Sequence, residues 1–430
     1  MKEKSVNLKA YRPAAGAVAA AAMLVLTACG SGGSDDPAAQ HLSDRGPITY
    51  VQGKDNTGDV KNMVVKWNAA HPDQKVTLKE QSDNPDQQHD DLVQHFKAQD
   101  AGYDVSSVDV VWTAEFAAQG WLQPLEGAMA IDSKPLLKEA VKAATYQGKL
   151  YAAPQTSDGG MLYYRKDLVP NPPKTWDELA ADCAVAKAHR MGCYAGQYAK
   201  YEGLTVNASE AINAAGGQIV KADGKTPDVD TPAAKKGLSF LADGYQKGVI
   251  PQEAITYQEE QGRQAFEDGK LLFLRNWSYV YNLAAADASS TVKGKFAVAP
   301  EPGPDGTGAS TLGGHSLGIS VYSAHKATAL DFVKFLESDP IQREYLQVQS
   351  NAPVLTALYR DPALLADPKL GYLKTLGDSL ATAKSRPVTP FYPAVTKAIE
   401  ENSYAAIKGD KSVDQALKDM QAAIASSVNG

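Results

Sequence analysis

The sequence is poor in cysteine, has no long hydrophobic run and carries no excess of positive charge. Only three of its 430 residues are cysteines, and no pattern in it predicts a metal site. Its uninterrupted run of small and apolar residues, 14–26, covers 13 positions, whereas a helix needs about 20 to span a bilayer. The formal charge of −7 makes nucleic acid a poor partner. No Gly-x-x-x-x-Gly-Lys-Ser/Thr loop is present, so we expect neither bound ATP nor another cofactor.

The N-terminus predicts an exported lipoprotein. Residues 1–28 are typical of a signal peptide, because a basic segment from Lys2 to Arg12 precedes the apolar run. Residues 26–29, Leu-Thr-Ala-Cys, resemble the bacterial lipobox, in which the cysteine receives a lipid and becomes the new N-terminus. We therefore expect a lipidated Cys29, a flexible tether over residues 29–46, and a protein held at the extracellular face of the cell membrane. The alternative is an ordinary signal peptide with an incidental cysteine.

The other two cysteines form an even pair once Cys29 is lipidated. Cys183 and Cys193 lie ten positions apart. In an exported protein this spacing favours a local disulfide that closes a short loop. The alternative is two buried free thiols.

Strand-like and helix-like segments alternate along the first part of the chain. Apolar residues recur at helical spacing from Val60 to Trp67, where the helix should end before His71-Pro72. A second helix is expected around Leu92 and Phe96. Short β-type runs separate these helices, at 48–51, 76–78 and 108–112. This alternation predicts an α/β domain with a mainly parallel sheet.

A second series of the same kind begins at residue 161. Its expected strands cover residues 161–164, 270–274, 295–299 and 318–322. Thr175 and Glu178 form a capping box that should open a helix, and apolar residues over 330–336 predict another. The last helix should start at the capping box of Ser412 and Gln415. It is expected to bury one apolar face, made of Val413, Leu417, Met420, Ile424 and Val428.

Five segments of the chain resemble one protein family. Residues 162–168 and 171–179, Leu-Tyr-Tyr-Arg-Lys-Asp-Leu and Asn-Pro-Pro-Lys-Thr-Trp-Asp-Glu-Leu, resemble bacterial extracellular solute-binding proteins of the maltose-binding class, family 1. Residues 109–117, 275–281 and 385–393 are similar to the trehalose/maltose-binding branch of that class. In this order and spacing, the five segments extend over almost the whole chain after the signal peptide.

This resemblance implies a two-lobed, periplasmic-binding-protein-like α/β fold of type II, in which the chain crosses between lobes three times. Lobe 1 would comprise residues 47–156 and 317–360, and lobe 2 residues 158–311 and 361–430. The resemblance further implies a monomer that is not an enzyme. Such a protein captures a sugar between its lobes and delivers it to the permease subunits of an ABC importer.

The resemblance also implies the residues of a sugar site. A sugar presents hydroxyl groups and apolar C–H faces, so its site combines charged side chains with aromatic rings. Asp109 and Asp158 would accept hydroxyl groups, and Arg386 would bridge the ligand and a carboxylate. Trp277 and Tyr279 would turn two aromatic faces toward the cleft.

Four further positions are expected at the ligand. Gly314 should expose a backbone amide near the second crossing, and Asn56, Asp83 and Gln88 lie in loops after the first two strands. Here the sequence departs from the trehalose/maltose pattern, which often has an acidic residue near Asn56 and an arginine near Gln88. His315 stands where that pattern commonly has an aromatic residue. The α-linked disaccharide that the resemblance implies is therefore specified only as trehalose-like or maltose-like.

Each of these residues has a purely structural alternative. Asp109 could cap a helix or shape a turn, and Arg386 could belong to a surface ion pair. Trp277 and Tyr279 could be ordinary core aromatics. Glu115 more simply supports the start of a helix than binds sugar.

Three other classes of function have some support in the sequence. Residues 314–318 match the Gly-x-Ser-x-Gly pattern of serine hydrolases, yet a strand-like run follows Ser316 where that motif needs a helix. Asp109 and Asp158 could be the carboxylate pair of a glycosidase, although no spacing argument pairs them. The Tyr163-Tyr164 pair could bind ferric ion, but the same dipeptide occurs in sugar binders.

Overall fold

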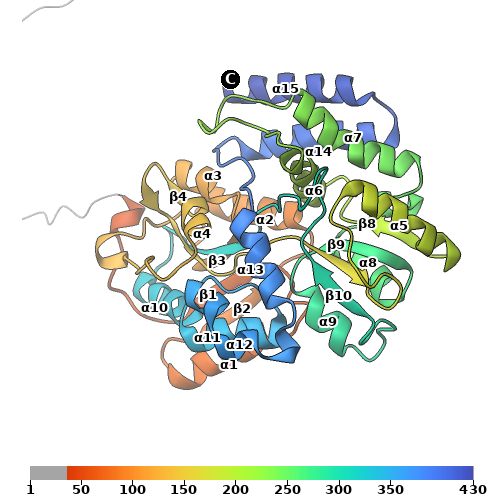
Figure 1. Ribbon diagram of the computed structural model, residues 1–430. Helices are drawn as coiled ribbons and strands as arrows, with labels where there is room; N and C mark the ends of the chain where they lie inside the picture. The colour runs from red at the N-terminus through yellow and green to blue at the C-terminus, as the bar shows by residue number, and fades with distance from the viewer. Residues whose placement is uncertain (1–35, 430) are drawn as a thin grey trace, which may run out of the picture.

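A computed structural model describes residues 36–429, so the predicted signal peptide and Cys29 lie outside the described residues. Within this range the molecule has two lobes, each built on its own β-sheet (Figure 1). The two-lobed α/β fold expected from the sequence is confirmed. Below, lobe one is the part built on the five-stranded sheet, and lobe two is the part built on the four-stranded sheet.

The sheet of lobe one has the strand order β2-β1-β3-β11-β6. These strands are β1 (Ile48–Gln52), β2 (Val76–Glu80), β3 (Val105–Asp109), β6 (Ala152–Pro154) and β11 (His315–Ile319). β1 pairs in parallel with β2 and β3, whereas β11 runs antiparallel to both β3 and β6. Four strands therefore point one way and β11 points the other, which agrees with the prediction of a mainly parallel sheet.

Helices cover both faces of this sheet. Successive residues of a strand point to opposite faces, so Tyr50 packs with α1 (Val60–Ala70) and α10 (Lys326–Leu336), while Val51 packs with α2 (Pro85–Lys97). All five residues of β3 are buried. Burial on both faces explains why β1 and β3 show no clear alternation of polar and apolar residues.

The sheet of lobe two has the strand order β10-β7-β9-β8. Its strands are β7 (Met161–Arg165), β8 (Gly192–Ala195), β9 (Leu271–Asn276) and β10 (Phe296–Ala299). The helices around it are α5 (Trp176–Ala188), α6 (Glu202–Ala214), α7 (Pro232–Gln246), α8 (Glu259–Glu267), α14 (Tyr392–Lys408) and α15 (Val413–Asn429). In Figure 1, α14 and α15 lie beside α6 and α7 at the top of the molecule. The predicted apolar face of α15 is buried at Leu417, Met420 and Ile424 and only partly buried at Val413 and Val428.

The segments that connect the lobes run side by side. The first lies between β6 and β7, the second between β10 and β11, and the third leaves lobe one after α11 (Asp339–Glu344). Gly159 of the first segment bridges Leu312 of the second, and Thr156 of the first bridges Pro353 of the third. These backbone contacts bring the three predicted crossings together in one place.

The remaining described elements are short. They are α3 (Thr113–Ala118), α4 (Lys138–Ala143), α9 (Val280–Ala286), α12 (Pro362–Leu365), α13 (Leu373–Thr382), β4 (Thr145–Tyr146), β5 (Lys149–Leu150) and the single helical turns η1 (Pro37–Ala39), η2 (Gly127–Met129), η3 (Gln252–Thr256), η4 (Tyr345–Gln349), η5 (Thr356–Arg360) and η6 (Pro368–Leu370). None of the helices within residues 36–429 is long and apolar enough to cross a membrane.

Two predicted strands are displaced along the chain. The expected strand over residues 108–112 is β3, which ends at Asp109, and the one over 318–322 is β11, which ends at Ile319. Both predictions followed β-branched and aromatic residues. Val110 and Trp112 are instead buried in the turn that leads into α3, while the buried strand positions include the serines Ser106 and Ser107.

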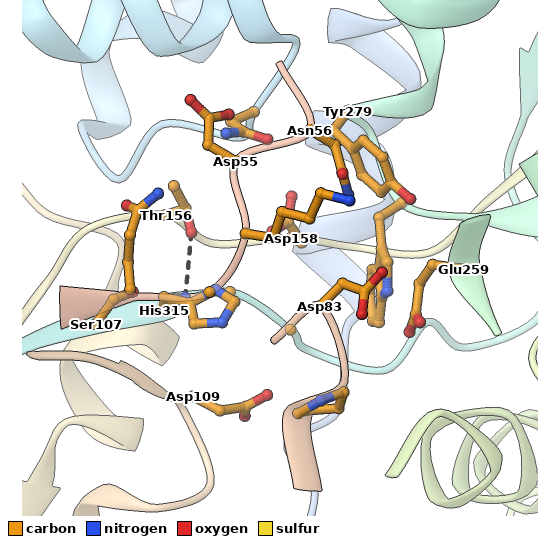
Figure 2. A pocket seen from close by; sticks show the side chains of 18 of the residues that line it. Asp55, Asn56, Asp83, Ser107, Asp109, Thr156, Asp158, Glu259, Tyr279 and His315 are labelled. Atoms are coloured by element: carbon orange, nitrogen blue, oxygen red, sulfur yellow. Dashed lines mark hydrogen bonds between the residues drawn. The ribbon is translucent and has the colours of Figure 1, made fainter. Parts of the chain in front are cut away.

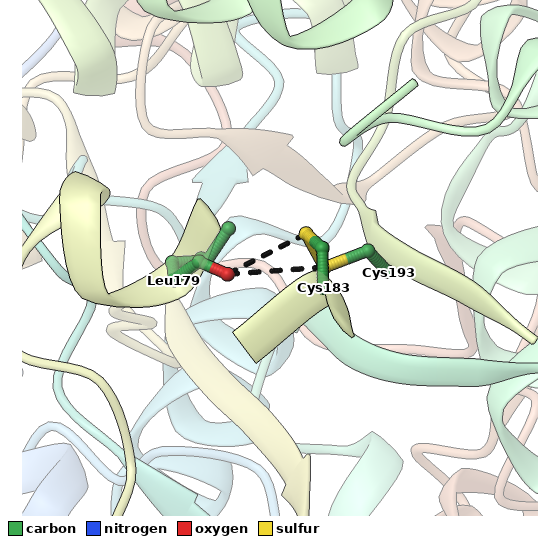
Figure 3. The surroundings of a disulfide bond; sticks show 3 residues. All are labelled: Leu179, Cys183 and Cys193. Carbon is green, nitrogen blue, oxygen red and sulfur yellow. Dashed lines mark hydrogen bonds between the residues drawn. A yellow bond between two sulfur atoms is a disulfide. The ribbon is translucent and has the colours of Figure 1, made fainter. Parts of the chain in front are cut away.

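The predicted disulfide and the predicted capping box are both confirmed at α5. Cys183 of α5 is bonded to Cys193 of β8, with a Cα–Cα distance of 5.1 Å (Figure 3). Thr175 Oγ1 accepts a hydrogen bond from Glu178 N, and Glu178 Oε2 accepts one from Thr175 N. The disulfide therefore fastens a well-capped helix to the edge strand of the sheet of lobe two.

Residues 36–46, the described part of the expected tether, lie against α10. Lys326 Nζ donates a hydrogen bond of 2.8 Å to Gln40 O, and Ala327 N donates one of 3.2 Å to Asp44 O. Arg45 forms an ion pair of 2.6 Å with Asp331. The chain is thus in contact with lobe one from residue 37 onward.

Candidate functional site

A cleft between the two lobes collects the residues predicted to bind a ligand. The space between its walls is about 1400 Å³, including the part that is open to solvent. All nine predicted residues line it: Asn56, Asp83, Gln88, Asp109, Asp158, Trp277, Tyr279, Gly314 and Arg386. Figure 2 shows Ser107, Thr156 and His315 along one side of this pocket and Tyr279 and Glu259 along the other. The structure brings the nine residues together, and their part in ligand binding stays a prediction.

Arg386 forms a buried bridge between the lobes. It follows α13 in the chain and is 3% exposed. Its Nη2 lies 3.0 Å from Oδ1 of Asp109, at the end of β3 in lobe one. Its Nη1 donates to Oε1 of Glu202, the first residue of α6 in lobe two. The structural alternative of a surface ion pair is therefore wrong for Arg386.

Glu202 is held from several sides. Tyr392 donates its hydroxyl hydrogen to Glu202 Oε1, and Thr396 Oγ1 donates a bond of 2.6 Å to Glu202 Oε2. Burial raises the pKa of Glu202, and the positive charge of Arg386 opposes that rise. Asp86 of α2 accepts a hydrogen bond of 3.3 Å from the main-chain N–H of Glu202. The start of α6 thus touches lobe one through the helix α2 and, by way of Arg386, through β3.

Asp158 lies on the first crossing between the lobes. Its Oδ1 accepts a hydrogen bond of 3.0 Å from Ser278 Oγ. Burial raises the pKa of this carboxyl, while the nearby His315 acts in the opposite direction. A carboxyl at the cleft is suited to accept hydrogen bonds from ligand hydroxyls.

Trp277 and Tyr279 follow β9, and both are partly buried in the wall of the cleft. The guanidinium of Arg275 stacks on the Trp277 ring at 4.0 Å from the ring centroid. Arg275 is itself fully buried and bound to Glu210, with Nε 2.6 Å from Oε2. Tyr279 donates its hydroxyl hydrogen to Glu260 at 2.7 Å. These contacts hold the two rings at the cleft wall. The alternative, in which both are ordinary core aromatics, predicted that they would lie in the core instead.

Gly314 sits where the second crossing enters β11. Its φ of +106° lies in the left-handed region, and a Cβ there would come 2.3 Å from the carbonyl oxygen of Thr156. Only glycine fits this approach of two crossing segments. The next residue, His315, donates its main-chain N–H to Thr156 Oγ1 at 3.1 Å (Figure 2).

Asn56, Asp83 and Gln88 differ in how freely they face the cleft. Asn56 and Asp83 are exposed, whereas Gln88 is buried at the start of α2. Gln88 Nε2 donates a hydrogen bond of 2.7 Å to Ser82 O. The amide nitrogen of Gln88 therefore already has a partner within lobe one.

Sequence reasoning missed several carboxylates of the cleft, namely Asp55, Glu202, Glu259 and Glu260. Glu259 and Glu260 begin α8, and Glu259 accepts a hydrogen bond of 2.7 Å from Tyr201. Their position in the first turn of a helix was visible in the sequence, but that position is common for any acid. Nothing in the sequence distinguished Glu202. The lining is rich in carboxylates, which accept hydrogen bonds from neutral hydroxyl groups.

The residues behind the other predicted classes of function lie in different surroundings. Ser316 is inside β11 and 1% exposed, so it does not stand on the exposed strand-to-helix turn of a serine hydrolase. Tyr163 is fully buried and donates its hydroxyl hydrogen to Trp277 O at 2.7 Å. Among residues 36–429 no group of three or more potential ligands surrounds a metal position. Glu115, in the first turn of α3, accepts a hydrogen bond of 2.7 Å from His89 and is not among the residues that line the cleft.

Sequence comparison relates the chain to transport proteins. Residues 53–343 match the family described as "Bacterial extracellular solute-binding protein". A protein of Deinococcus radiodurans, named "Probable ABC transporter-binding protein", is 33% identical over 348 residues, which cover 77% of this chain and 81% of the relative. A putative binding protein of Brucella abortus is 26% identical and covers 74% of this chain.

Structural comparison points to the same group. Maltose-bound MalE3 of T. maritima superposes with a TM-score of 0.82 at 31% identity and covers 88% of this chain and 98% of its own. The cyclic α-maltosyl-1,6-maltose binding protein of Arthrobacter globiformis has a TM-score of 0.73 at 25% identity and covers 90% of this chain. A solute-binding protein from Thermotoga lettingae bound with α-D-tagatose has a TM-score of 0.79 at 23% identity, which shows the shared fold alone.

Proposed function

The chain belongs to the bacterial extracellular solute-binding proteins of ABC transporters, and from this membership we propose that it captures an α-linked disaccharide of the trehalose or maltose kind. The sugar would bind in the cleft between the lobes and pass to the permease subunits of an ABC importer. The observation that carries the proposal is the combination of carboxylates and aromatic rings in the cleft wall. The likeness to a maltose-bound protein of 31% identity supports it.

Each part of the site has a proposed role. Asp109 and Asp158 accept hydrogen bonds from ring hydroxyls, and Arg386 bridges the ligand to Asp109. Trp277 supplies an aromatic face to the apolar side of a sugar ring, because its opposite face is covered by Arg275. Gly314, Asn56, Asp83 and Gln88 complete the lining, and Tyr279 adds a second ring.

The lobes are proposed to comprise residues 47–156 with 317–360 and residues 158–311 with 361–430. The distribution of the strands supports this division, because β1, β2, β3, β6 and β11 form one sheet while β7 to β10 form the other. We propose that the protein works as a monomer.

A thermal-shift screen across mono- and disaccharides tests the sugar proposal. A ligand that binds only the folded state at about 100 times its Kd stabilises by about 2.7 kcal/mol, so the midpoint should rise with ligand concentration. Maltose and trehalose are expected to give the largest shifts, and the ligand recovered after incubation should be intact. The proposal fails if no carbohydrate raises the midpoint.

The lipid anchor is proposed from residues 26–29 alone. If Cys29 carries the lipid, residues 30–36 span at most about 25 Å before the chain meets α10. Lobe one would then stay close to the membrane surface. Labelling of growing cells with a radioactive fatty acid is expected to mark the wild-type protein and not the Cys29→Ser variant.

A further inference from the structure

Glu202 lies at the point where both lobes meet the cleft. As the first residue of α6 it belongs to lobe two, yet its main-chain N–H is bonded to Asp86 of lobe one. The residue is 4% exposed and lines the cleft beside Arg386. No sequence motif pointed to this residue.

One nitrogen of the Arg386 guanidinium has no partner among the described residues. Its Nη1 and Nη2 are engaged by Glu202 and Asp109. Its Nε is buried and has no hydrogen-bond partner within residues 36–429. A buried N–H without an acceptor costs free energy, so an oxygen from a molecule in the cleft would stabilise it.

The two carboxylates define how Arg386 is presented. Two carboxylates more than balance the one positive charge of this guanidinium, so it acts toward a ligand as a hydrogen-bond donor and not as a counter-ion. Glu202 is the more firmly held partner, because Tyr392 and Thr396 of α14 both donate to it. Asp109 belongs to the other lobe, and its contact with Arg386 crosses the cleft.

We propose that Glu202 is a positioning residue for ligand capture: it holds Arg386 so that Nη2 stays on Asp109 across the lobes while the remaining N–H groups of the guanidinium donate to a hydroxyl oxygen of a neutral sugar. This inference rests on the proposed function of sugar binding. Glu202 itself does not need to touch the ligand. Glu202 affects the affinity for sugar by holding Arg386 in place.

A double-mutant cycle tests this dependence. Isothermal titration with maltose and with trehalose gives Kd for the wild type, Glu202→Gln, Arg386→Met and the double variant. Glu202→Gln keeps the side-chain shape but removes its charge, and we expect Kd to rise about tenfold. Arg386→Met should weaken binding at least as much, and the double variant should be no weaker than Arg386→Met alone. A purely structural role for Glu202 would instead give additive losses.

Glu400→Gln is the matched control. Glu400 is a partly buried carboxyl on α14 with Oε1 3.0 Å from Oγ1 of the same Thr396, but it forms no contact with Arg386 among the described ion pairs and hydrogen bonds. The sugar Kd of the Glu400→Gln variant should equal that of the wild type. If Glu202→Gln does not fold, Thr396→Val replaces it, since loss of the bond to Glu202 should raise Kd about threefold.

The outcomes separate the two proposals. The positioning role is overturned if the wild type binds sugar and Glu202→Gln leaves Kd unchanged. The same holds for Thr396→Val where that variant is used. In either case the proposed function still stands. Additive losses in the cycle overturn it as well. A wild-type protein that binds no carbohydrate overturns the proposed function and this inference with it.

Discussion

Asp109 serves the fold and the cleft at once. Its Oδ1 accepts a hydrogen bond of 3.1 Å from Val111 N and also lies 3.0 Å from Arg386. The turn-forming alternative is therefore present in a carboxylate that also lines the cleft, and its part in ligand binding stays a prediction. Removing Asp109 would also leave Arg386 with less counter-charge in a buried position, which destabilises a fold. Trp277 is the cleaner residue with which to probe the ligand.

Trp277→Ala is expected to raise the Kd for the preferred sugar about tenfold or more, because stacking on an aromatic face contributes both apolar area and geometry. The melting midpoint of the free protein should change far less than the affinity, since Trp277 is only partly buried. Titration calorimetry and a thermal melt measure the two effects. Trp176→Ala is the control, because Trp176 stacks on Phe240 at 4.3 Å, outside the cleft lining. Equal loss of affinity in both variants would contradict the assignment.

The sequence was informative for some cleft residues and silent for others. Asp109, Trp277 and Arg386 each stand inside a contiguous segment that resembles the family, so a linear reading finds them. Glu202 matters only because α6, β3 and the segment before α14 converge in space. Such convergence of distant segments leaves no local pattern.

Helix α10 carries ionisable groups at both ends that oppose its dipole. Its first residue is Lys326, where burial lowers the pKa to about 8. Its C-cap is Glu337, where burial raises the pKa to about 8, and the carboxyl oxygen Oε1 has no hydrogen-bond partner among the described residues. A negative charge at the C-terminal end of a helix is unfavourable, so both effects favour the neutral acid.

Glu337 should therefore make stability depend on pH. Its pKa is about 8 in the folded state against an ordinary value of 4.5, so the folded state binds more protons between these values. Stability contributed by this group is complete below pH 4.5 and is lost as pH rises through 8. Glu337→Gln should raise the melting midpoint at pH 8 by about 2–4 °C, the effect of about 1 kcal/mol in a domain of this size, and leave it unchanged at pH 4.5.

Differential scanning fluorimetry at both pH values measures this difference. Glu126→Gln is the control, because Glu126 is an exposed partner of Lys149 with 58% of its side-chain surface accessible. That variant should match the wild type at each pH. A Glu337→Gln midpoint equal to the wild type at pH 8 would show that burial does not hold Glu337 neutral.

The disulfide joins α5 to β8 and closes a loop of known length. Cys183 and Cys193 are separated by ten positions, and closing so short a loop stabilises by about 2–3 kcal/mol. The Cys183→Ser/Cys193→Ser variant should melt roughly 5–10 °C lower. Neither cysteine lines the cleft, so the sugar Kd of the folded variant should not change. A changed sugar Kd at an unchanged melting midpoint would mean that the disulfide serves ligand binding and not stability.

Helices and strands could be predicted where their apolar residues recur at the spacing of a single secondary structure. The α1 helix and the α5 capping box follow helical patterns and were found where expected. β3 and β11 were displaced by three residues because both faces of the sheet are covered. A strand buried on both faces tolerates small residues such as Ser106, so β-branched residues in the adjoining turn gave the stronger strand signal.

At the scale of the molecule, the three crossings form one connected group between the lobes. Gly159 bridges Leu312, and Thr156 bridges Pro353, so the segments are held together by their backbones. The residues that touch across the cleft, Asp109 with Arg386 and Asp86 with Glu202, lie on the elements that flank these segments. Motion about the crossings would separate or join these cross-lobe contacts as the cleft opens or closes.

Small-angle scattering tests this motion directly. A compact chain of this length has a radius of gyration of about 22 Å. Saturating sugar should lower the measured value toward that figure, because a ligand bound by both walls favours the closed arrangement. Trp277→Ala at the same sugar concentration should stay at the larger radius until the sugar is raised about tenfold. A radius that does not change in the wild type, under conditions where calorimetry shows saturation, would mean that the crossings hold the lobes fixed and that capture needs no closure.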